Sequence, residues 1–232
     1  LAIRKKPGLA KISNATRRLL KTLAKRKWTK VFIVTGRTLK NIKYLIGLKS
    51  ISYIGNHGFE LEDRNLTFFN KKAEDSKRAI RAIYGNLKKS LNIKDAIIEN
   101  KFYTLSIHYR LVKKRYLEIL KCKVYNIAAP YRKKGIILIT EGKKVLEIRP
   151  NLRWNKGSMV RWVMKKLRIR GGLPVYIGDD KTDEDAFKAL KKSGLTILVS
   201  KKPVPTEAKS RLKSPGEVFA FLRYVINLKN VK

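Results

Sequence analysis

The sequence predicts an α/β protein in which a small domain is inserted into a larger one. At both ends of the chain, helices alternate with short strands that are apolar on both faces, a pattern typical of a parallel sheet covered by helices. The middle follows the order helix, two strands, helix, two strands, which predicts a small antiparallel sheet with helices on one side. We therefore expect a Rossmann-like core formed by residues 1–73 and 151–232, and an inserted α/β cap formed by residues 74–150.

The composition is that of a globular protein. A chain of 232 residues with 44% hydrophobic content can bury the cores of one or two domains. No uninterrupted apolar run approaches the ~20 residues that span a bilayer, and the first residues lack an apolar signal core. The single cysteine, Cys122, excludes an intrachain disulfide and a cysteine-based zinc site. We expect a cytoplasmic protein without membrane contact.

The first part of the core contains two helices and several strands. Ser13 is expected to cap a helix whose leucines share one face. A short buried strand at residues 31–34 follows and ends at Thr35. Thr38 then opens a second helix, and a further strand and a hairpin occupy residues 53–69.

The cap alternates between apolar and polar side chains along its strands. Its helices are expected at residues 79–91 and 116–124, and its strands at residues 96–98, 105–109, 136–139 and 145–148. Because strand side chains alternate between two faces, Ser106, His108 and Arg110 point one way and their neighbours the other. Glu147 and Arg149 likewise share a face. One face of this sheet is therefore polar and available to a ligand.

The second part of the core resumes the first pattern. A helix follows Lys156, and a strand at residues 175–177 ends in Gly178-Asp179-Asp180. Thr182 is expected to cap the acidic helical turn that comes next. A further strand and a helix that begins with a capping box, Ser214-Pro215-Gly216-Glu217, complete the core.

Several polar residues follow strands or begin helices in this core. Thr35 ends one strand and offers a hydroxyl and backbone amides to a phosphate, because ligands of open parallel sheets bind beyond the carboxyl ends of the strands. Asp179, Asp180 and Asp183 gather at the end of another strand, where their hard oxygen ligands suit Mg²⁺. Lys156 lies at the start of a helix and can neutralise a phosphoryl group as a point charge.

Each of these residues also has a purely structural explanation. A threonine–glycine pair after a strand is usually a plain turn, and the aspartates can simply cap the following helix. A single lysine in so lysine-rich a chain is usually solvated. Their combination at the ends of strands favours a phosphoryl-binding site over three unrelated features.

Longer motifs carry a resemblance to a known family. They are Ile33-Val34-Thr35-Gly36-Arg37, Gly55-Asn56-His57-Gly58-Phe59-Glu60, Ser106-Ile107-His108-Tyr109-Arg110, Leu146-Glu147-Ile148-Arg149-Pro150, Trp154-Asn155-Lys156-Gly157 and the run from Tyr176 to Phe187. Together they resemble trehalose-6-phosphate phosphatases of the haloacid dehalogenase superfamily over essentially the whole chain. The run from Gly178 to Phe187 and the segments around Lys156 and Glu147 are specific to this family.

The resemblance implies a Mg²⁺-dependent phosphatase that hydrolyses trehalose 6-phosphate to trehalose and phosphate. In such enzymes an aspartate attacks the phosphorus, a second aspartate two residues later acts as general acid and base, and water hydrolyses the aspartyl-phosphate. The resemblance implies Thr35 and Lys156 as catalytic residues and Asp179, Asp180 and Asp183 as metal residues. The substrate-binding residues that it implies are Thr35, Gly36, Arg37, Asn56, His57, His108, Arg110, Glu147, Arg149 and Lys156.

The sequence departs from this family at its start. The motif Asp-x-Asp-Gly-Thr at the end of an opening strand is absent, and residues 1–7 resemble the loop that normally follows it. The missing strand would lie in the middle of the sheet, so its loss is expected to leave two strands unpaired. We expect this chain to be inactive and its parent protein to be a phosphatase.

Alternatives to this phosphatase remain open. A non-catalytic relative would bind the sugar phosphate or a trehalose-6-phosphate synthase partner, and a related phosphatase would act on sucrose phosphate. The formal net charge of +39 raises nucleic-acid binding. However, the lysines occur in almost every segment and no nucleic-acid-binding motif accompanies them, which favours a solvated surface over a nucleic-acid partner.

Overall fold

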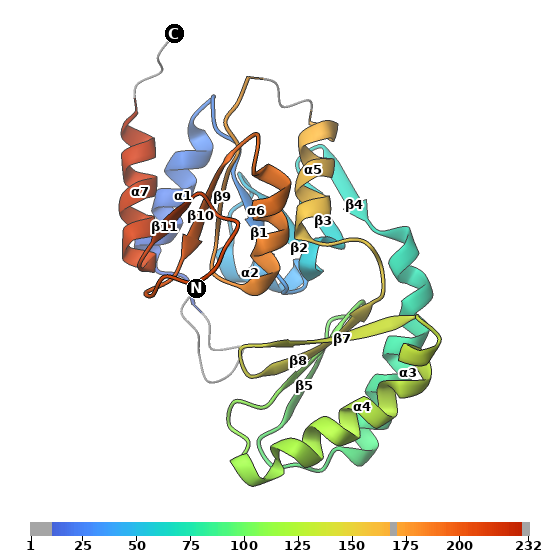
Figure 1. Ribbon diagram of the computed structural model, residues 1–232. Helices are drawn as coiled ribbons and strands as arrows, with labels where there is room; N and C mark the ends of the chain where they lie inside the picture. The colour runs from blue at the N-terminus through green and yellow to red at the C-terminus, as the bar shows by residue number, and fades with distance from the viewer. Residues whose placement is uncertain (1–10, 168–170, 229–232) are drawn as a thin grey trace. The chain divides into compact units, whose positions relative to one another are not determined.

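The computed structural model describes residues 11–167 and 171–228, and it is an α/β structure with three sheets. Contacts divide the described residues into two units (Figure 1). The larger unit, here called the core, combines residues 11–68 with the described residues from 154 onward, and the smaller unit, the cap, comprises residues 69–153.

The first sheet of the core has the strand order β1-β2-β3-β4. Its strands are β1 (Phe32–Val34), β2 (Ser52–Gly55), β3 (Glu60–Asp63) and β4 (Leu66–Phe69). β1 and β2 are parallel, whereas β2 and β3 are antiparallel. The helices α1 (Asn14–Lys25) and α2 (Leu39–Ile46) begin at the two predicted caps, since the side chains of Ser13 and Thr38 accept hydrogen bonds from Thr16 N and Asn41 N. Their apolar faces pack with Tyr53 in one cluster.

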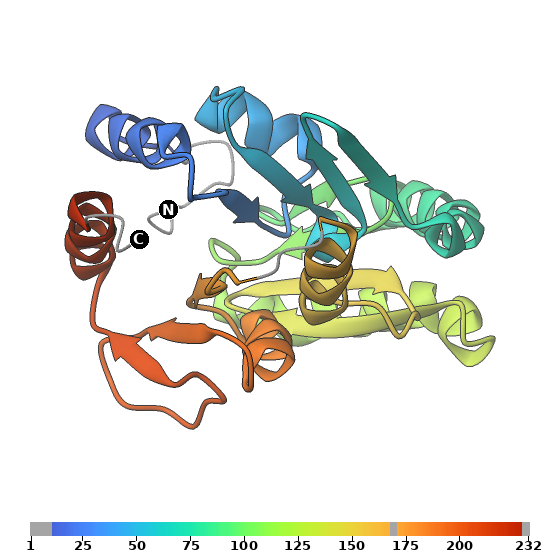
Figure 2. The same cartoon turned by 90° about the horizontal axis from the view of Figure 1, so that it is seen from above.

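The second sheet of the core is parallel and has the order β11-β10-β9. Its strands are β9 (Val175–Gly178), β10 (Leu195–Val199) and β11 (Ser210–Leu212), and its helices are α5 (Lys156–Lys166), α6 (Glu184–Leu190) and α7 (Pro215–Asn227). The sequence does not predict β11, because this three-residue edge strand is mostly polar and exposed. α7 lies beside α1 (Figures 1 and 2).

Two strands of the core have an open edge, as expected from the sequence. Within the described residues, β1 pairs only with β2, and β9 pairs only with β10 (Figure 2). All three residues of β1 are half-buried, whereas all four residues of β2 are buried. The apolar helix α7 contains no buried residue. β1, at the open edge of its sheet, is therefore less buried than its neighbour β2.

The cap contains an antiparallel sheet of order β5-β6-β8-β7, as predicted. Its strands are β5 (Ile97–Asn100), β6 (Leu105–His108), β7 (Ile137–Gly142) and β8 (Val145–Pro150), and its helices are α3 (Glu74–Ser90) and α4 (Leu117–Lys133). Leu105 and Ile107 are fully buried against the helices in one apolar cluster. Ser106 lies directly opposite Glu147 on the other face, so the predicted alternation is confirmed.

One predicted helix cap is wrong. Thr182 lies inside a short 3₁₀ turn, η5 (Lys181–Asp183), and Asp180 caps that turn in a reciprocal arrangement with Asp183. The turn begins two residues earlier than expected because the Asp180 carboxylate accepts a hydrogen bond from Lys181 N at 2.7 Å. At the last helix, Ser214 accepts from Glu217 N as predicted, but the Glu217 carboxylate accepts from Lys213 N.

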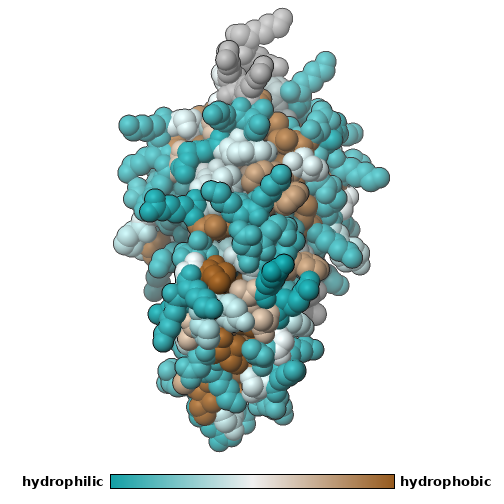
Figure 3. Space-filling model, turned by 90° about the vertical axis from the view of Figure 1, so that its right-hand side faces the viewer, coloured by the Kyte–Doolittle hydropathy of each residue, from teal (hydrophilic) through white to brown (hydrophobic). Residues whose placement is uncertain are grey.

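The surface shown in Figure 3 is mainly hydrophilic, with apolar residues in small groups between polar ones. Across the described chain, no helix combines the length and the apolar character that crossing a bilayer requires.

Candidate functional site

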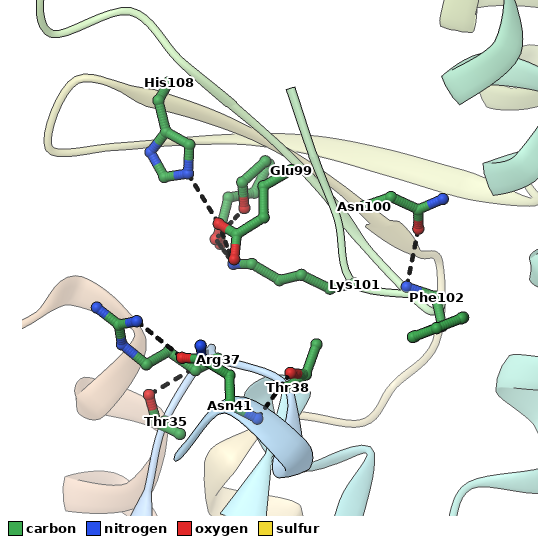
Figure 4. A network of polar contacts seen from close by, with 11 residues as sticks. Thr35, Arg37, Thr38, Asn41, Glu99, Asn100, Lys101, Phe102 and His108 are labelled. Atoms are coloured by element: carbon green, nitrogen blue, oxygen red, sulfur yellow. Dashed lines mark hydrogen bonds and ion pairs between the residues drawn. The ribbon is translucent and has the colours of Figure 1, made fainter. Parts of the chain in front are cut away.

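The turn after β1 is held by its own threonine. Thr35 N donates to Ile54 O at 3.0 Å, which continues the β1–β2 ladder. Arg37 N donates to the Thr35 hydroxyl oxygen at 3.2 Å, and the Arg37 guanidinium donates to Asn41 Oδ1 at 2.8 Å (Figure 4). Thr35, Gly36 and Arg37 therefore form a compact turn at the carboxyl end of a strand, in front of the α2 N-terminus.

Asn56 and His57 lie beneath this turn. Asn56 is 0% exposed and His57 is 6% exposed. Both have a left-handed backbone, with φ of 46° at Asn56 and 58° at His57. Asn56 N donates to Arg37 O at 2.7 Å, and His57 N donates to Thr35 O at 3.0 Å. The structure thus places these two expected substrate-binding residues behind Thr35, inside the protein.

Lys156 is buried at the start of α5. Asn155 caps this helix, because its Oδ1 accepts from Ser158 N at 2.9 Å. The Lys156 ammonium donates to Asp183 Oδ1 at 2.7 Å, and the Tyr176 hydroxyl donates to the same oxygen at 2.8 Å. The sequence-predicted residues Lys156 and Asp183 therefore meet as an ion pair.

Asp183 also organises the loop after β9. Its second oxygen, Oδ2, accepts from Asp179 N at 3.1 Å and from Asp180 N at 3.0 Å. Burial alone would raise the pKa of Asp183, but the Lys156 ammonium and these hydrogen bonds outweigh it and hold the pKa below its ordinary value. Burial and the neighbouring Asp183 charge raise the pKa of Tyr176 well above its ordinary value. In the contact between Asp183 and Tyr176, Asp183 is thus the carboxylate and Tyr176 the neutral phenol.

The three expected metal residues have different surroundings. Both oxygens of Asp183 accept hydrogen bonds, and Asp180 caps η5, whereas Asp179 is exposed directly after β9. No group of three or more His, Cys, Asp or Glu that could hold a metal occurs within residues 11–167 and 171–228. Asp183 thus supports the loop that carries Asp179 and Asp180. An exposed Asp179 fits Mg²⁺, which is commonly bound through one or two carboxylates together with water and substrate phosphate.

The polar face of the cap sheet carries a cluster of charged residues. His108 Nε2 lies 2.9 Å from Glu99 Oε2, and the Lys101 ammonium lies 3.9 Å from Glu99 and 3.6 Å from Glu147 (Figure 4). Ser106 donates to Glu147 at 3.2 Å. We call Glu99, Lys101, Ser106, His108 and Glu147 the cap cluster. Its lysine side chain is only 6% exposed.

The sequence missed two members of the cap cluster. Glu99 and Lys101 were missed because the apolar pattern ends at Ile98, whereas β5 runs to Asn100. Two-residue alternation continued from Ile97 would have put both on one face. The Arg110 side chain is exposed and donates to Lys143 O at 2.7 Å. Arg149 is half-buried on β8, opposite Leu138.

Comparison with known proteins finds a family that matches most of the chain. The sequence pattern of the family described as trehalose-phosphatase matches residues 2–216. Trehalose-phosphate phosphatase B of Arabidopsis thaliana is 34% identical over 240 residues, which cover 96% of this chain and 62% of that protein. The chain therefore spans less than two thirds of the length of this relative.

Two solved structures have a similar fold. The crystal structure of a trehalose-6-phosphate phosphatase related protein has a TM-score of 0.82 at 24% identity and covers 97% of this chain and 92% of its own. The C-terminal domain of the C. albicans trehalose-6-phosphate phosphatase has a TM-score of 0.76 at 20% identity and covers 98% of this chain and 88% of its own.

Proposed function

The chain belongs to the trehalose-phosphatase family, and from this premise we propose that its protein is a Mg²⁺-dependent phosphatase acting on trehalose 6-phosphate. The products are trehalose and phosphate. The observation that carries the proposal is the buried Lys156–Asp183 pair, which fixes an ammonium beside the loop that bears Asp179. Because Asp183 holds Lys156 in place, the lysine can meet an anionic ligand as a fixed point charge.

The phosphoryl group is bound by Thr35 and Lys156. An ammonium has three N–H donors, and Asp183 accepts one of them at 2.7 Å, so further donors serve a phosphoryl oxygen. The Thr35 turn supplies a hydroxyl at the end of a parallel strand, whose oxygen accepts from Arg37 N while its hydrogen can be donated to a phosphoryl oxygen. Both groups stabilise the negative charge of the transferring phosphoryl group.

Asp179 is the proposed Mg²⁺ ligand, with Asp180 beside it. When bound, Mg²⁺ neutralises charge on the phosphoryl oxygens and orients them for displacement. Asp183 is proposed to support this metal site, because its two oxygens hold Lys156, Tyr176 and the backbone of Asp179 and Asp180. It holds both the lysine and the loop in place.

The attacking aspartate is proposed to lie on a parallel strand between β1 and β9. The sequence contains no Asp or Glu before Glu60, so none of its first residues can supply a carboxylate. The open edges of β1 and β9, the half-buried residues of β1 and the lack of buried residues in α7 all support an additional strand there. Such a strand would satisfy the backbone groups of both edges.

The cap cluster is proposed to bind sugar hydroxyls. Carboxylates accept hydrogen bonds from hydroxyl groups, and an ammonium donates to them, so Glu99, Lys101 and Glu147 offer both kinds of partner on one face. His108 and Ser106 hold the two carboxylates in place. Arg110 and Arg149 remain proposed substrate-binding residues from the resemblance alone. Cytoplasmic location also stays a prediction.

A binding experiment tests this assignment on the 232-residue chain. Calorimetric titration with Mg²⁺ present compares trehalose 6-phosphate, sucrose 6-phosphate and trehalose. We expect trehalose 6-phosphate to bind most tightly, because only it offers both the phosphate and the matching disaccharide. Equal affinity for sucrose 6-phosphate would favour the related sugar-phosphate phosphatase, and absence of binding would contradict the proposal.

A non-catalytic relative is the second candidate. The observation that favours it is that the cap cluster and the buried Lys156 can hold a sugar phosphate without an attacking aspartate. A regulatory protein of this kind would bind trehalose 6-phosphate, or a synthase partner, without turnover. Phosphate release separates the two candidates.

A further inference from the structure

We propose that the turn Gly55–Glu60 is a positioning element that joins the Thr35 turn to the start of α5, with Glu60 as its central residue. The proposal rests on the proposed function, because it concerns the two groups assigned to the phosphoryl group, Thr35 and Lys156. It assigns to Asn56 and His57 an indirect role through Thr35 in place of contact with substrate.

The first connection runs to the Thr35 turn. Asn56 N donates to Arg37 O at 2.7 Å and His57 N donates to Thr35 O at 3.0 Å, so both ends of the turn are held by adjacent amides. The His57 ring packs directly on Gly36, where an added Cβ would lie 2.5 Å from the ring. Only glycine fits at position 36 with this ring in place.

The second connection runs to the start of α5. Trp154 Nε1 donates to Gly58 O at 2.7 Å. Gly58 has φ of +98°, and a Cβ there would lie 3.0 Å from Met159 Cβ and 3.2 Å from Asn155 O. Asn155 caps α5 and directly precedes Lys156. The turn is therefore in contact with the residues that set the position of the buried lysine.

Glu60 ties the turn to α2. Its Oε2 accepts from Asn56 Nδ2 at 2.7 Å and from Leu39 N at 3.3 Å. Leu39 is the first residue of α2, where a carboxylate is favoured by the helix dipole. The single oxygen Glu60 Oε2 thus holds both Asn56, in the turn Gly55–Glu60, and Leu39, at the start of α2.

The strained backbone of the turn Gly55–Glu60 favours the positioning role. Asn56 and His57 are consecutive non-glycine residues in the left-handed region, and such residues persist where surrounding contacts over-determine them. Two glycines would make the same turn without strain. They would lose the Asn56 amide that reaches Glu60 and the His57 ring that packs on Gly36.

Replacing Glu60 by Ala and by Gln tests the proposal. Gln keeps an oxygen that can accept from Asn56 Nδ2 and Leu39 N, whereas Ala removes it. Ile197→Val, a buried change on β10 that costs about 1 kcal/mol, serves as a control of similar stability loss. Each variant is examined by amide hydrogen exchange and by calorimetric titration with trehalose 6-phosphate.

We expect Glu60→Ala to speed exchange at residues 35–39 and at residues 154–158 together, and to weaken trehalose 6-phosphate binding about tenfold, because a small misplacement of binding groups is costly. Glu60→Gln and Ile197→Val should change neither readout by more than about twofold. If Glu60→Ala matches Ile197→Val in both readouts, the positioning role is overturned. If the unmodified chain does not bind trehalose 6-phosphate, the proposed function fails, and hydrogen exchange alone decides whether the two segments are coupled through Glu60.

Discussion

The ammonium of Lys156 lies 2.7 Å from the carboxylate of Asp183, and both side chains are only 7% exposed. Removing one partner of a buried ion pair leaves an uncompensated charge, which costs about 3–5 kcal/mol. We therefore expect Lys156→Met to lower the free energy of unfolding by about 3 kcal/mol, since Tyr176 and two backbone amides still support Asp183. Urea denaturation measures this loss.

The matched control for Lys156 is Lys181→Met. Lys181 is exposed, so its replacement should change the unfolding free energy by no more than about 0.5 kcal/mol. The double variant Lys156→Met/Asp183→Asn should lose less than the sum of the single variants, because it leaves no unpaired charge. Additive losses would show that the pair is not coupled.

Two glycines give opposite predictions for the same substitution. A Cβ on Gly157 would lie 2.1 Å from the Asp185 backbone oxygen, so Gly157→Ala must push α5 and α6 apart. We expect a loss of at least about 2 kcal/mol in thermal or urea unfolding. Gly85 lies inside α3 with nothing within 4 Å of an added Cβ, so Gly85→Ala should stabilise by about 0.5–1 kcal/mol. Equal effects would contradict the close α5–α6 contact.

The lowered pKa of Asp63 predicts how the free energy of unfolding depends on pH. Burial would raise its pKa, but hydrogen bonds from Lys30 and Ser52 outweigh burial and hold the pKa below its ordinary value. The stability that this carboxylate contributes is therefore complete above its unfolded pKa, about pH 4, and is lost as the pH falls through its folded value.

The test compares unfolding of the unmodified chain and of Asp63→Asn from pH 7 downward. At neutral pH the variant should be less stable by about 1 kcal/mol, because Lys30 is partly exposed. The difference should shrink as the pH falls below about 4. A constant difference would mean that Asp63 titrates alike in the folded and unfolded chains.

The alternation of apolar and polar residues was sufficient to predict most of the fold. The caps at Ser13 and Thr38 and the two faces of β6 follow from local side-chain chemistry and strand geometry. β11 could not be predicted in this way, because its Ser210 and Arg211 are exposed and its pairing with β10 is formed by the backbone.

The charged partners in the candidate sites are less predictable. Position alone predicted that Asp183 lies near a ligand site. It could not show that both carboxylate oxygens are taken by Lys156, Tyr176 and backbone amides, because these contacts depend on tertiary packing. Lys101 follows the polar end of β5, where hydrophobic periodicity gives no signal, so its pairing with Glu99 and Glu147 appears only in the folded cap.

A Lys101 variant tests whether sugar binding and phosphate binding depend on different residues. Lys101→Met leaves Glu99 and Glu147 without the ammonium beside them, so we expect trehalose 6-phosphate to bind about tenfold more weakly. Affinity for inorganic phosphate should be unchanged, because Thr35 and Lys156 are intact. Lys94→Met, at an exposed position of the same unit, is the control and should leave both affinities unchanged. A loss of phosphate affinity in Lys101→Met would contradict the separate roles.

The most direct test of the central claim is phosphate release from trehalose 6-phosphate with Mg²⁺. It compares the 232-residue chain with a chain extended upstream in its source gene to include a strand bearing Asp-x-Asp. We predict release by the extended chain only, because β1 and β9 both have an open edge and no acidic residue precedes Glu60. Turnover by the 232-residue chain at ordinary enzyme rates, or no release by the extended chain, would contradict the account.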